Sequence, residues 1–360
     1  MGLLRLYFAF IVIFEHSSPS HVKLLFINSD GAVLGFFVLS GFYMAMVLET
    51  HYYRNLKAFY FNRFLRLYPS YLVCLLLTII LFCSLKAVFH QAYGPMVAMD
   101  HAPLSLPAEI WFAATQITMW GQDINTYVAV GAHGQLIPCL RSTRLGESLS
   151  NYSFVPQAWT LSIELSFYAL APWLVRWRTW ILTVLFFGGL ALRVAALGTL
   201  DSEATVWFGR FLPLELTVFF GGILAWRVVG GIGSAIRTNL GVTTAVGTVI
   251  VIFLGWLWSA RAGQCLTAPL LVCLVLPWLW LNVANERLDR FLGDLSYPLY
   301  VSHIMVCYLL LACLPAAQMA LLPIYAIIGS LFMALVLHYG VEVPLGRFKL
   351  TSYKGNRHGR

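Results

Sequence analysis

The chain has 360 residues, of which 60% are hydrophobic and only 11% carry a charged side chain. A soluble domain is nearer half apolar and a quarter charged, so this composition disfavours a soluble enzyme, a nucleic-acid-binding protein and a disordered chain. The formal net charge of +8 does not require a polyanionic partner, because five basic residues lie in the terminal stretch 347–360, as in the cytoplasmic tail of a membrane protein.

Apolar segments follow one another along most of the chain. A membrane span needs roughly 20 mostly apolar residues. Ten segments are candidates, with ends good to about four residues: 3–18, 31–49, 67–89, 159–175, 179–198, 211–229, 240–259, 265–283, 296–315 and 320–342. The sequence therefore predicts an all-α polytopic membrane protein, a bundle of about ten transmembrane helices within residues 1–346, followed by the basic tail 347–360.

The longest connection, residues 90–158, contains one further apolar stretch. Residues 107–121 are too few for a span and include Glu109 and Gln116. We interpret the stretch as an interfacial or re-entrant helix, not as an eleventh span.

The positions of Lys and Arg predict the orientation in the membrane. With ten spans, 15 of the 23 Lys and Arg residues lie on the side of both termini, 5 lie on the opposite side, and 3 lie within spans or at their ends. The positive-inside rule then predicts cytoplasmic termini. An eleventh span would move the basic tail to the outside, which is a second reason to reject it.

The first span carries three ionisable residues, and an ionisable group in lipid is a candidate functional residue. Eleven positions separate Arg5 from His16, so a helix presents both on one face, roughly 16.5 Å apart along its axis. Glu15 points about 100° away from His16. In the alternative without chemistry, Arg5 reaches the cytoplasmic interface and His16 lies at the outer one.

Two arginines, Arg63 and Arg66, precede the apolar part of the third span on the predicted cytoplasmic side. Their spacing of three places them on one helix face at the membrane surface. A topological anchor explains such a pair, and taken alone it is the favoured interpretation. Two guanidinium groups also suit a phosphate.

Other polar residues lie inside predicted spans. Glu164 is about one turn into the span 159–175, near Tyr168, and a simple hydrogen bond between helices would also explain it. Tyr297 and His303 belong to a polar stretch at the start of the span 296–315, and Ser40 lies in the run at 36–42. There is no glycine-rich phosphate loop, HExxH helix or GxSxG elbow. These residues alone fit a transporter with a proton relay or an enzyme with its site inside the bundle.

Several motifs together resemble one family across essentially the whole chain. They are Arg5-x10-His16, FFVLSGF at 36–42, Arg63-x-x-Arg66 before Leu67-Tyr68-Pro69, WTLSIELSFY at 159–168, Arg210 with Glu215 and Gly221-Gly222, GDLSYPLYVSH at 293–303, and the final VEVP. In this order they resemble the acyltransferase-3 family of integral-membrane O-acyltransferases, in its stand-alone form.

The resemblance implies transfer of an acyl group, usually acetyl from acetyl-CoA as co-substrate, to a hydroxyl group, without a metal. It implies membrane lipid and a hydroxylated acceptor, a cell-envelope or exported glycan, as partners, no nucleic acid, and an inner (plasma) membrane location. The candidate catalytic residues are His16, Arg5 and Glu164, the candidate coenzyme residues are Arg63 and Arg66, and the further candidates are Ser40, Tyr168, Tyr297 and His303. His16 would act as a base or carry the acyl group itself. The alternative is a multi-span transporter or flippase of a glycan or lipid-linked precursor.

Overall fold

The structure is a computed structural model, and it describes residues 1–18, 28–52, 55–139, 146–199, 208–231, 260–283 and 287–350. Nine helices match nine of the ten predicted spans: α1 (Gly2–Ser17), α2 (Ser29–Thr50), α3 (Leu56–Phe89), α6 (Ala158–Leu174), α7 (Thr179–Thr199), α9 (Leu212–Gly231), α11 (Ala260–Val283), α12 (Arg287–Cys313) and α13 (Leu322–Leu337). The predicted span 240–259 and most of the tail 347–360 lie outside the described residues. Six helical segments of the described chain are by themselves long and apolar enough to cross a membrane.

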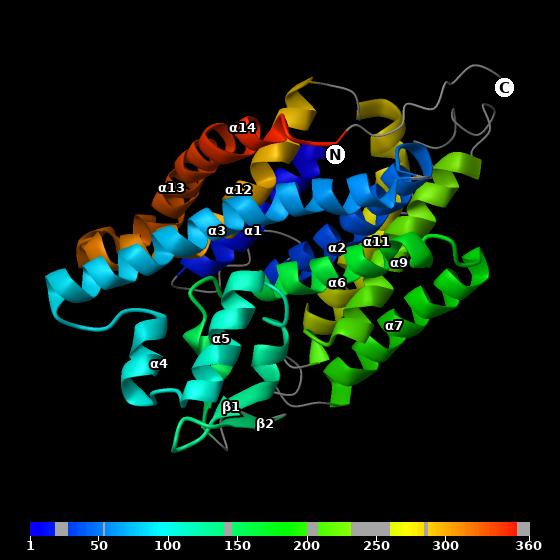
Figure 1. The fold of residues 1–360 in the computed structure, drawn as a ribbon. Helices are drawn as coiled ribbons and strands as arrows, with labels where there is room; N and C mark the ends of the chain where they lie inside the picture. Colours follow the sequence, from blue (N-terminus) through cyan, green and yellow to red (C-terminus); the bar gives the residue numbers. More distant parts are fainter. Residues whose placement is uncertain are drawn as a thin grey trace.

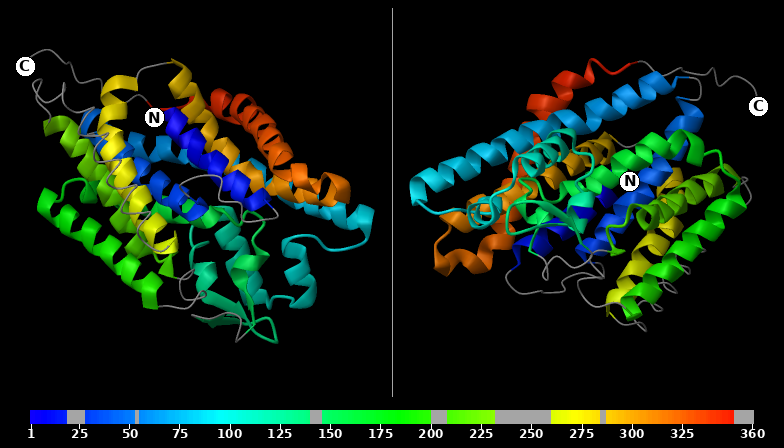
Figure 2. Two further views of the ribbon diagram at one scale, coloured as in Figure 1. Left: turned by 180° about the vertical axis from the view of Figure 1, so that it is seen from behind. Right: turned by 60° about the horizontal axis from the view of Figure 1, so that its bottom comes forward.

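The long helices lie side by side in one bundle (Figure 1). The two further views agree that α7, α9 and α11 form one side of the bundle and that α3, α12 and α13 form the other (Figure 2). The helices α1 and α2 run between these sides. In Figure 1 the N-terminus and the short helix α14 (Val343–Gly346) lie at the top, and the strands β1 and β2 lie at the bottom.

The segment predicted as a long connection, 90–158, contains structure of its own beneath the bundle. It holds α4 (Pro95–His101), α5 (Leu106–Thr118) and an antiparallel sheet of β1 (Val128–Val130), β2 (Leu136–Pro138) and β3 (Glu147–Ser148), in the order β2-β1-β3. Ala129 pairs with both Ile137 and Ser148. With 13 residues, α5 is shorter than a span requires. The strands were not predicted, because two or three residues are too few for an alternating pattern.

Hydrogen bonds at helix ends fix α1 and α2. At one end of α1, the backbone N–H of Leu3 donates to Asp289 Oδ1 of α12 at 3.0 Å. At the other end, Glu15 Oε2 accepts the N–H of Ser29 at 2.5 Å. Asn28 Oδ1 accepts the N–H of Gly31 at 2.8 Å as the N-cap of α2. Glu15 therefore satisfies an otherwise unpaired amide at the start of α2, a role that its sequence position did not reveal.

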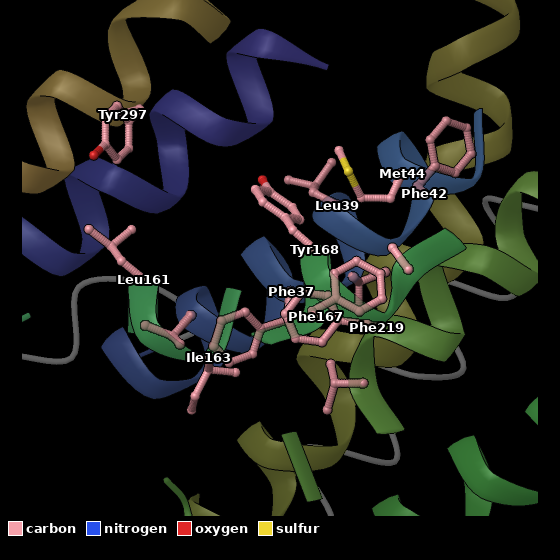
Figure 3. Close-up of a cluster of buried hydrophobic side chains, with 14 of the residues drawn as sticks. Phe37, Leu39, Phe42, Met44, Leu161, Ile163, Phe167, Tyr168, Phe219 and Tyr297 are labelled. Carbon is pink, nitrogen blue, oxygen red and sulfur yellow. The ribbon is translucent and has the colours of Figure 1, made fainter. Parts of the chain in front are cut away.

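Two glycines allow α2 and α9 to approach backbone to backbone. A Cβ atom at Gly41 would lie 2.0 Å from the carbonyl oxygen of Phe219, and one at Gly222 would lie 1.9 Å from that of Val38. Stacked rings extend the contact, with Phe219 at 4.7 Å from Phe37 and 4.0 Å from Phe167 between centroids. Figure 3 shows this stack, with the hydroxyl of Tyr168 directed away from it. Glycine at these positions is thus required for helix contact.

The Gly222→Ala variant tests this contact. We expect it to lose about 1–3 kcal/mol of stability, because the backbones must separate to admit one methyl group. The matched control is Gly230→Ala on the same helix, where a Cβ would meet nothing within 4 Å. Alanine there favours the helix by up to about 1 kcal/mol. The measurement is the unfolding midpoint of the detergent-purified protein, and equal midpoints for the two variants would contradict this account.

Candidate active site

Side chains from five helices line an inner cavity of about 60 Å³. Six of the nine candidate residues line it: Arg5 from α1, Ser40 from α2, Arg66 from α3, Glu164 and Tyr168 from α6, and Tyr297 from α12. Arg63 lies next to it, with its guanidinium carbon 5.9 Å from the centre of the Tyr168 ring. The structure thus brings together residues that are almost 300 positions apart in the sequence.

Glu164 is held by two hydroxyl groups. Ser40 Oγ donates to Glu164 Oε1 at 2.5 Å, and the hydroxyl of Tyr168 donates to the same oxygen in a short hydrogen bond. The bond from Ser40 joins α2 to α6, so the simple explanation of Glu164 as a hydrogen-bond partner between helices is part of its role. The same residue also lines the cavity, where its carboxylate is available to a bound molecule.

The positive charges at the inner cavity are only partly compensated. Arg66 Nη1 lies 3.5 Å from Asp294 Oδ1, and the Asp294 side chain is half exposed. Arg5 lies over the ring of Tyr43 at 4.6 Å, a cation–π contact. Within the described residues, the buried Nε atoms of Arg5 and Arg63 have no hydrogen-bond partner. Such donors favour an anionic ligand at this end of the bundle.

Tyr297 uses its hydroxyl group in a contact between two helices. The hydroxyl of Tyr297 donates to the carbonyl oxygen of Leu67 at 2.6 Å, which ties α12 to α3. Tyr297 also lines the inner cavity. Tyr297 therefore shapes the cavity wall, and its hydroxyl is engaged in a helix contact.

A second, outer cavity of about 630 Å³ contains His16. Its wall also carries the charged residues Asp30, Arg193, Arg210 and Glu215. Arg193 Nη2 lies 3.0 Å from Glu215 Oε1, and both side chains are almost fully buried. Arginines and acids are therefore equal in number in the wall of this cavity, whereas two arginines and one acid line the inner cavity.

Arg210 lies two residues before the start of α9, and two side chains contact it. Its Nη1 donates to Thr126 Oγ1 at 2.9 Å, and its guanidinium carbon lies 4.8 Å from the ring centre of Trp159. Burial lowers the pKa of Arg210, and the negative charge of Asp30 opposes this shift. The segment 90–158 thus contributes to the outer cavity through Thr126.

The hydrogen bond of His16 defines which ring nitrogen is free. Its Nδ1 lies 2.8 Å from the carbonyl oxygen of Val12. A carbonyl oxygen only accepts, so the neutral ring carries its proton on Nδ1 and the lone pair on Nε2. His303 repeats this arrangement, because its Nδ1 lies 2.6 Å from the carbonyl oxygen of Tyr300. Its Nε2 is buried and has no partner among the described residues.

The two imidazole rings lie against each other, with centroids 5.3 Å apart and planes at 67°. His16 is exposed toward the outer cavity, whereas the His303 side chain is fully buried and lines neither cavity. His303 therefore lies behind His16, where it contacts the ring of His16 and not a molecule in the cavity.

The inner and outer cavities adjoin at two residues, Val33 and Tyr300, which line both. The Tyr300 hydroxyl lies 2.9 Å from Thr160 Oγ1. Arg5 and His16, on one helix, thus lie in different cavities with a shared wall between them. Tyr300 was not among the candidates, although it forms part of the polar stretch that contains Tyr297 and His303.

The charges of the outer cavity were also missed by sequence reasoning. Arg210 and Glu215 belong to one of the family motifs, but the sequence assigns them no role. Arg193 lies within the predicted span 179–198 and is not a candidate residue. Arg193 lies on α7 and Glu215 on α9, and 22 positions separate them. No spacing rule within one helix connects such residues, so their pairing becomes visible only when the helices are assembled.

Paired cavities with charged walls, enclosed by apolar helices, define a multi-pass membrane protein with an internal polar site. A family model described as an acyltransferase domain, that of the acyltransferase-3 family, matches residues 1–342. The chain belongs to this family and is a membrane acyltransferase, as its motifs predicted. No curated protein and no solved structure matches the chain.

The contacts of Glu164 give a test of the inner cavity. We expect Glu164→Ala to lower stability by about 1–3 kcal/mol, because the buried hydroxyls of Ser40 and Tyr168 lose their acceptor. Glu164→Gln retains a carbonyl oxygen at that position, so it should lose less. The unfolding midpoint in detergent distinguishes the variants, and a Gln variant no more stable than the Ala variant would contradict the hydrogen-bond account.

Proposed function

We propose that the protein transfers an acyl group, acetyl in the first instance, from cytoplasmic acyl-CoA to a hydroxyl group of a cell-envelope or exported glycan or a similar acceptor. One observation carries the proposal: a cation-lined cavity and a histidine-containing cavity adjoin at Val33 and Tyr300. A donor and an acceptor can therefore occupy separate spaces and meet at the shared wall.

The inner cavity suits the donor. Arg63 and Arg66 are the proposed contacts of the coenzyme phosphates, since guanidinium groups bind phosphate oxygens in pairs. Arg5 lies further in, between this end of the bundle and His16. The remaining wall is largely apolar, with Phe36, Phe37 and Leu161, as the pantetheine arm requires.

The outer cavity suits the acceptor. Its volume of about 630 Å³ falls within the range of about 300–1,000 Å³ that is common for small-molecule sites. Trp159 offers an aromatic face, and the exposed Asp30 offers carboxylate oxygens to hydroxyl groups. This combination of a ring and several hydrogen-bonding groups fits a sugar.

The free Nε2 of His16 supplies the base. In direct transfer, Nε2 takes the proton of the acceptor hydroxyl while the hydroxyl oxygen attacks the thioester carbonyl carbon. The C–O bond forms, the C–S bond breaks, and the coenzyme leaves as a thiolate that recovers the proton. In the alternative route, Nε2 attacks first and carries the acyl group to the acceptor. The Tyr300 hydroxyl at the shared wall is the proposed donor to the developing oxyanion.

The proposed orientation agrees with this division. The end of the bundle that holds α14 and the N-terminus also holds Arg63 and Arg66, near the start of α3 (Figure 1). The excess of Lys and Arg on this side predicts that it faces the cytoplasm, where acyl-CoA is made.

The arginine pair can be tested by coenzyme binding. We expect Arg63→Ala and Arg66→Ala each to weaken acetyl-CoA binding by about 10–100-fold, since each loses a charge-assisted contact of about 1.5–3 kcal/mol. Lysine should restore little, because it lacks the paired donors. Lys57→Ala, an exposed basic residue in the first turn of the same helix, is the control. Isothermal titration of the purified proteins measures the dissociation constants, and unchanged values for both alanine variants would reduce the pair to a topological anchor.

His16→Ala tests the base. We expect transfer of radiolabelled acetyl from acetyl-CoA to the glycan fraction of membranes to fall by about 10²–10⁴-fold per folded protein. Membrane abundance and the dissociation constant for acetyl-CoA should stay unchanged, because His16 lies in the other cavity.

The comparison variant is Arg5→Ala, which should lose only part of the activity, since Arg5 positions the donor and does not react. A His16→Ala protein with full activity per molecule would refute the proposed mechanism. A fall in abundance with normal specific activity would make His16 a packing residue.

A further inference from the structure

The segment after α14 returns to the start of α3, where it is clamped by one side chain. Asn62 Nδ2 donates to the carbonyl oxygen of Leu350 at 2.9 Å, and the N–H of Leu350 donates to Asn62 Oδ1 at 2.9 Å. The same Nδ2 also donates to the Tyr52 hydroxyl at 2.9 Å, and Asn62 is only 4% exposed. A buried amide that satisfies both backbone groups of Leu350 fixes the adjacent residues of this segment in space.

The clamp brings Lys349 to the arginine pair. Asn62 directly precedes Arg63, and Lys349 directly precedes Leu350, so the two hydrogen bonds hold the lysine near the arginine pair, where the charges of Arg66 and Arg63 act on it. Lys349 is exposed, and among the described residues it has no carboxylate within ion-pair distance. Partial burial lowers the pKa of Lys349, the positive charge of Arg66 adds to this shift, and Asp294 opposes it.

Three positive charges, those of Arg63, Arg66 and Lys349, lie near one another, and the two carboxylates of Asp294 and Glu342 offset them only in part. Arg66 has Asp294 at 3.5 Å, but the Nε of Arg63 is buried without a partner among the described residues. The nucleotide end of coenzyme A carries a pyrophosphate, joined directly to the pantetheine arm, and a separate 3′-phosphate on the ribose. The pyrophosphate must lie closer to the cavity, and the 3′-phosphate must lie farther out.

We propose that Lys349, held in place by Asn62, binds the 3′-phosphate of acyl-CoA, while Arg63 and Arg66 bind the pyrophosphate. The assignment follows the order of exposure among the three: Arg63 and Arg66 are partly buried, and Lys349 is exposed. A lysine ammonium is a mobile point charge, which suits an exposed phosphate monoester. This role rests on the proposed use of acyl-CoA. Under it, the segment 347–350 contributes to ligand binding as well as to the predicted membrane orientation.

The test compares acetyl-CoA with acetyl-3′-dephospho-CoA, which lacks only the 3′-phosphate. We expect Lys349→Gln to weaken binding of acetyl-CoA by about tenfold and to leave binding of the dephospho compound unchanged. The preference of the unmodified protein for acetyl-CoA over the dephospho compound should therefore disappear. Arg347→Gln is the matched control, because Arg347 is an exposed cation of the same segment that contacts the Phe348 ring.

Asn62→Leu tests the clamp. We expect it to reproduce the Lys349→Gln result with the lysine still present, because Leu350 loses both hydrogen bonds. If this variant does not fold, Lys349→Gln alone decides. Equal weakening of both compounds by Lys349→Gln, or of neither, overturns the assignment. If the unmodified protein binds neither compound, acyl-CoA is not the donor and the proposed function itself fails. If it binds acetyl-CoA and Lys349→Gln leaves that affinity unchanged, only the role of Lys349 fails.

Discussion

Arginine side chains that lie inside an apolar bundle without full compensation set the constraint on which the inner cavity depends. A charge in such surroundings costs several kcal/mol unless it is paired. Arg66 reaches Asp294, but Arg5 and Arg63 rest against the rings of Tyr43 and Tyr168 and keep a buried, unpartnered Nε among the described residues. A ring face attracts a cation without neutralising it. The cavity is thus stable without a ligand and remains attractive to an anion.

The helix α1 fixes the distance between the cation Arg5 and His16. Its 16 residues carry Arg5 near one end and His16 near the other, about 16.5 Å apart. Both ends are tied to neighbours, through Asp289 at Leu3 and through Glu15 at Ser29. Among the described residues, the cavity that holds Arg5 meets the cavity that holds His16 at Val33 and Tyr300. Under the proposed function, the length of one helix separates the phosphates from the reacting carbon.

Those features that depend on one segment at a time could be predicted from the sequence. Hydropathy located the nine described spans, and the spacing of eleven set Arg5 and His16 on one helix. Features that depend on which helices are neighbours could not be predicted. Three such features join separate elements: the ion pair of Arg193 with Glu215, the hydrogen bonds between Asn62 and Leu350, and the position of Tyr300 in the walls of both cavities. The predicted orientation and the proposed roles of the site residues are consistent with these contacts and stay predictions.

The two cavities differ in charge balance, and this difference matches the two proposed substrates. In the outer cavity the acids Asp30 and Glu215 are matched by the two arginines Arg193 and Arg210. The inner cavity is lined by the two arginines Arg5 and Arg66 and by the acid Glu164. Arg63 lies beside them, and Asp294 pairs with Arg66 from outside the cavity wall, so the positive charges still outnumber the acids. A neutral acceptor gains little from an unbalanced field but can form hydrogen bonds with both members of an ion pair. A polyanionic donor needs the excess positive charge, and that excess keeps it at its own end of the bundle.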